Sequence, residues 1–165
     1  MDLSEKQAPL KERYREAPDE ARITLRATGA QGDEPVACSV DIGRLVQSAE
    51  AHPGVGGPGT GACSGDLLLG ALAACAQLTC QMVAASMGID AREIAVEAEG
   101  DLDLRGTFGV SREASVGFEA IRLRFAIDAP GAGDEELARL IEKTERYCTV
   151  LQTLRAPPPV ESERD

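Results

Sequence analysis

The sequence predicts an α+β domain in which strands and helices follow one another in the order ββα ββα. Three patterns support this class: segments in which apolar and polar residues alternate, one long apolar segment, and a later segment with helical periodicity. The chain has 165 residues, of which 43% are hydrophobic and 27% charged. These values are typical of one soluble globular domain.

The first part of the chain is predicted to form an arm, a hairpin and a loop. Residues 1–20 are charged, carry two prolines and are expected to be a flexible arm. Alternation on either side of the turn-like segment GAQGDEP predicts a strand hairpin over residues 21–42. Residues 43–62 are predicted to be a long loop whose glycine-rich part, residues 53–62, leads directly into the apolar segment. Its GxGxxG pattern does not follow an apolar strand, so a dinucleotide site is not expected.

The most apolar segment, Leu67–Met87, predicts a central helix that is buried in the domain. Ser64 is a suitable N-cap, Asp66 lies favourably in the first turn, and Gly88 can end the helix in the left-handed conformation. A membrane span is not expected, because four polar side chains interrupt the segment: Gln77, Thr79, Gln81 and Ser86.

The second part of the chain repeats the order of two strands and a helix. Residues 93–106 and 116–128 are predicted to be extended and to pair with each other. Residues 133–148 have the periodicity of an amphipathic helix and acidic residues in the first turn. The segment TVLQTL that follows is expected to be a short helix or strand. We therefore expect one domain over residues 21–160 and a C-terminal tail over residues 161–165.

Charge and composition exclude several classes of function. The formal charge is −11, from 28 acidic and 17 basic residues, so the protein should repel nucleic acids and anionic membrane surfaces. Only 3% of the residues are aromatic, which disfavours a platform for base stacking. His52 is the only histidine, so sites that need two imidazoles are excluded. The cysteines lack the short spacing that a structural zinc site prefers, so a metal site is not expected. The first residues lack a secretory signal, which predicts a cytoplasmic protein.

The five cysteines are the remaining candidates for chemistry. An odd number without a CxxC pair indicates free thiols in a reducing compartment. Cys75 and Cys80 lie on the predicted central helix, where five residues turn the direction by about 500°, so their side chains point roughly 140° apart and cannot serve one pocket. A reactive Cys75 would need a partner from elsewhere, and Cys148 lies at a junction between predicted elements. The alternative for Cys75 is a packed core thiol.

Three segments together show a family resemblance: ACSGDLLLGALAACAQLT, AEGDLDLRGTFGV and ERYCTVLQTL. In this order they are similar to the OsmC and organic hydroperoxide resistance (Ohr) family of thiol-dependent peroxidases, over nearly the whole chain from residue 21 to residue 160. The family has one cysteine within its long central helix and a second near the end of the later helix, positions that Cys75 and Cys148 match. The resemblance implies an intertwined homodimer in which two sheets wrap the central helices and the active sites lie at the subunit interface.

The resemblance also implies an activity in oxidative stress defence. Cys75 would reduce an organic hydroperoxide to an alcohol and become a sulfenic acid, and Cys148 would then form a disulfide with it. An external dithiol, such as a lipoylated protein, would reopen that disulfide, and this cycle would need no metal, flavin, haem or other cofactor. The family uses an arginine to contact the thiolate and an acidic residue to orient that arginine. Asp66 lies where many OsmC-type members have a glutamate, and members of the Ohr branch place theirs where this chain has Gly65.

Several alternatives stay open at the level of sequence. Arg44 is a candidate for the activating arginine, and so are Arg26 and Arg155. Because Asp66 replaces the longer glutamate, a non-catalytic protein of the same fold that binds a small ligand or senses redox state is the second hypothesis. A thiol hydrolase is disfavoured, since His52 would have to be its base.

Overall fold

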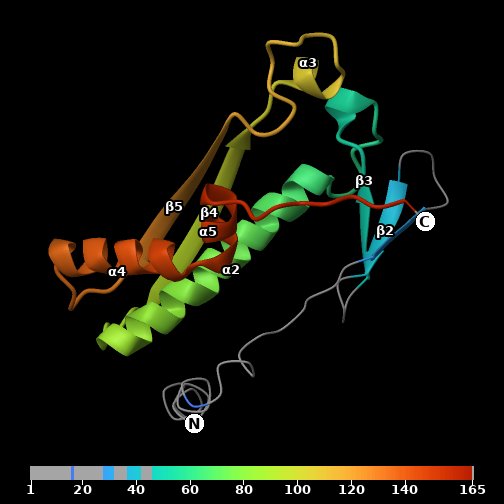
Figure 1. The fold of residues 1–165 in the computed structure, drawn as a ribbon. Coiled ribbons are helices and arrows are strands. Elements are labelled where there is room, and N and C mark those ends of the chain that lie inside the picture. The colour runs from blue at the N-terminus through green and yellow to red at the C-terminus, as the bar shows by residue number, and fades with distance from the viewer. Residues whose placement is uncertain (1–15, 17–27, 32–36, 42–45, 165) are drawn as a thin grey trace. The chain divides into compact units, whose positions relative to one another are not determined.

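The structure, a computed structural model, describes residue 16 and residues 28–31, 37–41 and 46–164 (Figure 1). The chain divides into a first unit, Met1–Leu68 with Asp101–Ala120, and a second unit, Leu69–Gly100 with Ile121–Asp165. The elements in chain order are β1 (Thr28–Gln31), β2 (Ala37–Asp41), β3 (Val46–Glu50), the 3-10 helix η2 (Pro53–Val55), α2 (Ser64–Met87), β4 (Glu93–Asp101), α3 (Leu104–Thr107), β5 (Ala120–Asp128), α4 (Asp134–Tyr147) and α5 (Thr149–Arg155).

The first unit contains an antiparallel sheet in the order β1-β2-β3. The pairing of β1 with β2 confirms the hairpin predicted in residues 21–42, although residues 21–27 lie outside the described residues and β1 runs into the predicted turn. The prediction of a continuous loop over residues 43–62 is wrong at β3, which pairs with β2. Polar Gln47 and small Ala49 face inward on β3 and give little hydrophobic signal, so the hydrogen bonds of the neighbouring strand define it. The observed order is therefore not ββα ββα, because a third strand precedes α2.

The glycine-rich segment after β3 is held in a defined turn. The Glu50 carboxylate accepts hydrogen bonds from the Thr60 hydroxyl, at 3.1 Å, and from the Gly61 N–H. The Glu50 N–H in turn donates to the Ala62 carbonyl at 3.0 Å. A Cβ at Gly57 would lie 1.6 Å from the Ala51 carbonyl oxygen, so the close approach of the two backbone segments requires glycine there.

Helix α2 begins in the first unit and continues through the second. Gly88 follows it with φ +72°, which confirms the predicted left-handed end. Ser64 is the first helical residue rather than the preceding cap. Helix α2 is long and apolar enough to cross a membrane. The core helix of a soluble protein can meet the same criteria of length and hydropathy. Only one face is buried within this chain, so the prediction of a buried helix holds for part of its surface: the buried residues are Leu72, Ala76, Thr79, Cys80, Val83 and Ala84.

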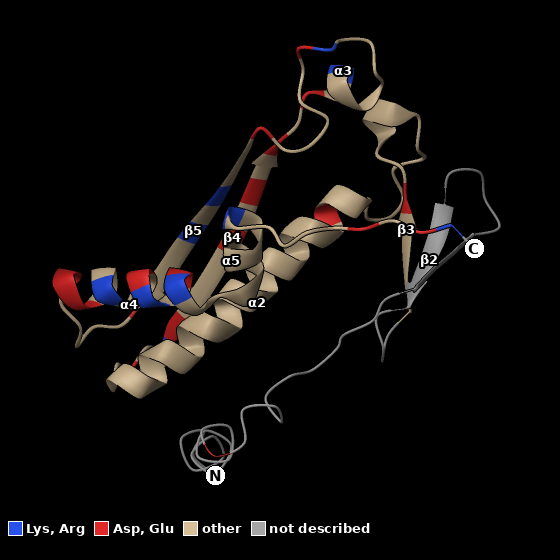
Figure 2. Ribbon diagram, in the orientation of Figure 1, with Lys and Arg blue, Asp and Glu red and all other residues tan. Residues whose placement is uncertain are grey.

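Strands β4 and β5 form a two-stranded sheet. The Arg92 N–H donates to the Asp128 carbonyl at 2.7 Å and the Glu119 N–H to the Asp101 carbonyl at 2.8 Å, as expected for antiparallel strands. Arginines of β5 form ion pairs with glutamates of β4, such as Arg124 with Glu99 at 3.1 Å. Figure 2 shows the blue and red positions on the two strands. The extended segment predicted over residues 93–106 ends early because α3 begins there.

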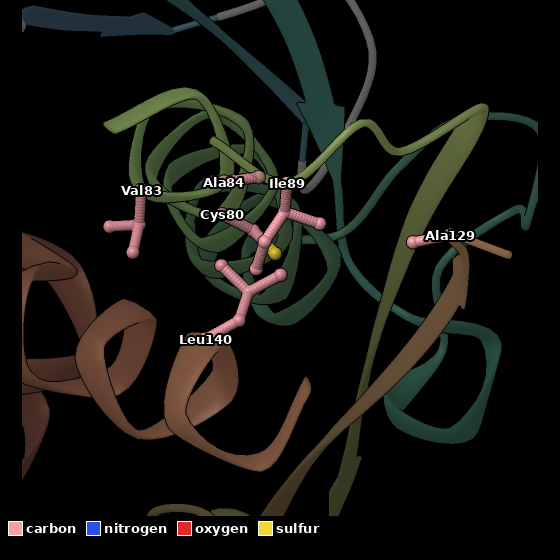
Figure 3. Packing of buried hydrophobic residues seen from close by; sticks show 6 residues of the cluster. All are labelled: Cys80, Val83, Ala84, Ile89, Ala129 and Leu140. Atoms are coloured by element: carbon pink, nitrogen blue, oxygen red, sulfur yellow. The ribbon is translucent and has the colours of Figure 1, made fainter. Parts of the chain in front are cut away.

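Helices α4 and α5 and the inner face of the β4–β5 sheet enclose two hydrophobic clusters of the second unit. Helix α4 confirms the amphipathic helix predicted over residues 133–148, and α5 shows that the next segment is a helix, where the sequence left a helix or a strand open. Residue 148 separates the two helices. The Cys80 cluster consists of the buried residues Cys80, Val83, Ala84, Ile89, Ala129 and Leu140 (Figure 3). The Cys148 cluster consists of the buried residues Leu72, Ala76, Cys148 and Leu151, with Cys75 at its margin.

Candidate active site

Cys75 and Cys148 lie next to each other in the second unit. Cys75 is a partly buried residue in the middle of α2, whereas Cys148 is 0% exposed. Cys148 ends α4 and is the N-cap residue of α5, with extended backbone (φ −71°, ψ 105°) that turns the chain between the two helices. The two sulfurs are in hydrogen-bonding contact, and both cysteines are free.

The surroundings of Cys75 favour its thiolate. Burial raises the pKa of this thiol, but hydrogen bonds from the Val150 N–H, the Cys148 thiol, the Thr79 hydroxyl and the Thr149 N–H oppose burial and leave the pKa below its ordinary value. Two of these donors are the first N–H groups of α5, which have no partner within that helix. Although Cys75 is far from the N-terminus of its own helix, it lies at the N-terminus of another.

The pKa of the Cys148 thiol is shifted in the opposite direction, above its ordinary value. Burial raises the pKa of its thiol, and so does the neighbouring Cys75, while the Leu151 N–H acts in the other direction. At a pH between the pKa values of the two thiols, Cys75 carries the negative charge. Cys148 keeps its proton and donates a hydrogen bond to the Cys75 sulfur. The arrangement therefore combines a nucleophilic sulfur with a protonated sulfur in contact, which is the chemical requirement for a thiolate that first reacts and is then captured as a disulfide.

The other described cysteines lie elsewhere. Cys80 belongs to the Cys80 cluster, which agrees with the predicted divergence of Cys75 and Cys80, and burial raises the pKa of its thiol while Thr144 acts in the opposite direction. Cys63 lies in the first unit and is partly buried. The side chain of Cys38 lies outside the described residues.

Asp66 supports the start of α2. Its Oδ2 accepts a hydrogen bond from the Cys63 N–H at 2.9 Å, one turn before it in the chain. This bond lowers the pKa of Asp66, and His52 contributes a smaller effect in the same direction. The contact satisfies an N–H group at the helix start, where a carboxylate is electrostatically favoured.

The structure leaves the predicted arginine unplaced. Arg44 and Arg26 lie outside the described residues. Arg155, the third candidate, forms an ion pair with Glu145 at 2.9 Å at the end of α5. Of the four predicted site residues, the described part of the chain brings together Cys75 and Cys148.

Two contributors to the site were missed at the level of sequence. Thr79 follows Cys75 by four residues, one helical turn, so a polar residue at this spacing in an apolar helix was an available signal. The N–H groups of Thr149 and Val150 had no side-chain signal of their own, because backbone donors become available only when a helix starts at that place. Within residues 46–164, no group of three or more His, Cys, Asp or Glu residues is placed to hold a metal ion.

A comparison of the sequence with protein families identifies the chain. The profile described as OsmC-like protein matches residues 57–163, which include α2, both sulfurs and α5. The chain belongs to the OsmC-like family. A comparison of the sequence with curated proteins finds no match.

Solved structures share the OsmC-like fold. An OsmC-like protein from Mycoplasma pneumoniae superimposes with a TM-score of 0.70 at 18% identity, covering 82% of this chain and 89% of that chain. An organic hydroperoxide resistance protein from Elizabethkingia anophelis, with thiocyanate bound, gives 0.62 at 24% identity over 82% and 91%. A putative organic hydroperoxide resistance protein from Vibrio cholerae, with captopril in one of its active sites, gives 0.59 at 21% identity over 82% and 86%. These similarities establish an α+β OsmC-like fold.

Proposed function

We propose that this OsmC-like protein is a thiol-dependent peroxidase that reduces organic hydroperoxides to alcohols. The observation that carries the proposal is the contact between Cys75, whose surroundings favour the thiolate, and Cys148, which keeps its proton. Family membership supports the same activity, since structures of similar fold include organic hydroperoxide resistance proteins.

The first step is oxidation of Cys75. Its thiolate attacks the distal oxygen of the hydroperoxide, the O–O bond breaks, and the alkoxide takes a proton from solvent and leaves as the alcohol. Cys75 becomes a sulfenic acid. The aliphatic side chains of the Cys148 cluster favour a hydroperoxide with an apolar substituent over hydrogen peroxide.

The second step closes the disulfide. Cys148 loses its proton and attacks the Cys75 sulfur, the S–O bond breaks, and hydroxide leaves as water with that proton. One thiolate of a dithiol such as a lipoylated protein then attacks the disulfide, forms a mixed disulfide with one cysteine and releases the other. The second thiol of the dithiol attacks the dithiol sulfur of this mixed disulfide and displaces the cysteine, so that the dithiol is oxidised to its own disulfide and both cysteines are reduced. Because Cys148 is fully buried, we assign the Cys75 sulfur as the one attacked.

The assembly and location follow from the same proposal. Leu78 and Met82 lie on α2, with 59% and 39% of their surfaces exposed in the single chain, and a second copy would cover them in the homodimer that is expected for this family. Arg44 is proposed to contact the Cys75 thiolate, and Asp66 to orient that arginine in addition to its role at the start of α2. The protein is proposed to act in the cytoplasm in defence against oxidative stress.

A redox sensor is the second candidate. The contacts that set the Cys75 pKa are backbone N–H, hydroxyl and thiol groups, and no described arginine is among them. A protein with this pair of sulfurs could form the disulfide once and signal through it without rapid turnover.

The test is to add cumene hydroperoxide and dihydrolipoamide and to follow loss of peroxide, with mass spectrometry of the cysteines after a single addition of peroxide. The peroxidase predicts many turnovers and a Cys75–Cys148 disulfide, which is absent in Cys75→Ser and replaced by a Cys75 sulfenic acid in Cys148→Ser. Formation of the disulfide with one equivalent of peroxide, and no turnover with any dithiol, would favour the sensor. Oxidation at Cys63 or Cys80 with Cys75 unchanged would overturn both.

A further inference from the structure

Thr79 is a buried polar residue beside the reacting sulfur. It is 5% exposed and lies on the buried face of α2, one turn after Cys75. Its hydroxyl hydrogen-bonds with the Cys75 thiol. No buried side-chain nitrogen or oxygen in the described residues lacks a hydrogen-bond partner, so this hydroxyl is part of a satisfied arrangement.

Two other threonines show the usual behaviour of this side chain in a helix. The Thr144 hydroxyl donates to the Leu140 carbonyl at 2.8 Å, and the Thr153 hydroxyl donates to the Thr149 carbonyl at 2.8 Å. In both cases the acceptor is the backbone four residues earlier. At Thr79 the residue four positions earlier is Cys75, whose sulfur offers a side-chain acceptor on the same face of the helix.

We propose that Thr79 is a positioning residue for Cys75: its hydroxyl donates a hydrogen bond to the sulfur, fixes the direction of that sulfur toward Cys148, and stabilises the thiolate. A hydrogen bond from a hydroxyl to an ionised group stabilises the folded protein more than a hydrogen bond to a neutral group does. The lowered pKa of Cys75, to which Thr79 contributes, agrees with this assignment. The catalytic consequence rests on the proposed peroxidase function, whereas the ionisation of Cys75 does not.

The test compares three variants by their Cys75 ionisation. Thr79→Val keeps the shape of the side chain and removes the hydroxyl, and Thr79→Ser keeps the hydroxyl. Thr144→Val removes a buried threonine hydroxyl that lies beside Cys80 instead of Cys75. The rate at which iodoacetamide alkylates Cys75 is measured against pH, with fragment mass spectrometry to separate Cys75 from Cys80. No peroxide is used, so the alkylation profiles can be interpreted even if the protein is not a peroxidase.

We expect Thr79→Val to shift the Cys75 profile to higher pH and to lower its alkylation rate at neutral pH about tenfold. Thr79→Ser should keep the wild-type profile, and Thr144→Val should leave Cys75 unchanged. A wild-type profile in folded Thr79→Val would overturn the proposal, and so would an equal shift in Thr144→Val. Should Thr79→Val fail to fold, as judged by circular dichroism, Thr79→Ala provides the same comparison, since alanine is the strongest helix former.

Discussion

Cys75 and Cys80 lie five residues apart on α2, each beside a buried threonine, and yet their thiols have opposite tendencies. The pKa of Cys80 is raised, with burial as the largest cause and only the Thr144 side chain acting against it. Burial also raises the pKa of Cys75, but this thiol has more hydrogen-bond donors than Cys80 has. Besides the Thr79 hydroxyl, two N–H groups of α5 and the Cys148 thiol act on it, and its pKa is lowered. A single hydroxyl does not outweigh burial, whereas a helix N-terminus and a second thiol added to it do.

The packing around Cys80 explains why it lacks these donors. Its buried neighbours in the Cys80 cluster are aliphatic side chains from α2, α4 and the segments beside them (Figure 3). Leu140 approaches from the middle of α4, where every backbone N–H is used within the helix. Cys75 instead faces the junction of α4 and α5, where a new helix begins and its first N–H groups have no internal partner.

The largest expected difference between the two cysteines is in turnover. Replacing Cys75 by serine removes the nucleophile and should lower peroxidase activity about a thousandfold or more. Cys80→Ser changes a packed thiol outside the site and should keep most of the activity. Consumption of cumene hydroperoxide with a dithiol gives both values. Equal losses in the two variants would mean that the contrast between the two sites has no functional meaning.

The second prediction concerns which sulfur an incoming thiol attacks. The disulfide, prepared with diamide, is treated with cysteamine, quenched in acid and blocked with N-ethylmaleimide. Attack at Cys148 would expel the better leaving group, Cys75, whose pKa is the lower of the two, but it requires access to the Cys148 sulfur. Full burial of Cys148 blocks attack almost entirely, so cysteamine should be found on Cys75 in more than about tenfold excess. Cysteamine mainly on Cys148 would contradict the assigned direction.

The third prediction uses the pH dependence of alkylation. Because the pKa of Cys75 is lowered, its thiolate persists below the pH at which an ordinary cysteine loses it, and reactivity falls only as the pH drops through that lowered value. Cys80, with a raised pKa, should become reactive only above the ordinary range. At neutral pH the rates should differ at least about tenfold. In denaturant the two profiles should coincide; a difference that survives unfolding would point to local sequence as its cause.

The smallest expected effect at Cys75 comes from a change in the Cys80 cluster. Leu140 is fully buried, so Leu140→Ala should lower the free energy of unfolding by about 2–5 kcal/mol. Since Leu140 belongs to the other cluster, the pH profile of Cys75 alkylation should stay the same. Urea unfolding and alkylation of the folded variant measure the two quantities. A shifted Cys75 profile would show that the two clusters are coupled.

Local patterns in the sequence were sufficient to predict the two long helices. The apolar segment that ends at Gly88 and the acidic start of the segment over residues 133–148 predicted α2 and α4. Strand β3 escaped prediction because Gln47 and Ala49 give a weak alternation, and pairing with β2 compensates for it. Helix α3 escaped for a different reason, since the Asp103 side chain accepts the Arg105 N–H and turns the chain where alternation suggested a strand.

The sequence by itself determined the helix that carries Cys75 and the family to which the chain belongs. Helical periodicity also required Cys75 and Cys80 to face different surroundings. Only the tertiary structure decided which of these surroundings favours a thiolate. The reason is that the decisive groups, the N–H groups of Thr149 and Val150, are backbone donors some seventy residues away, and they acquire direction and electrostatic effect only once α5 starts beside α2.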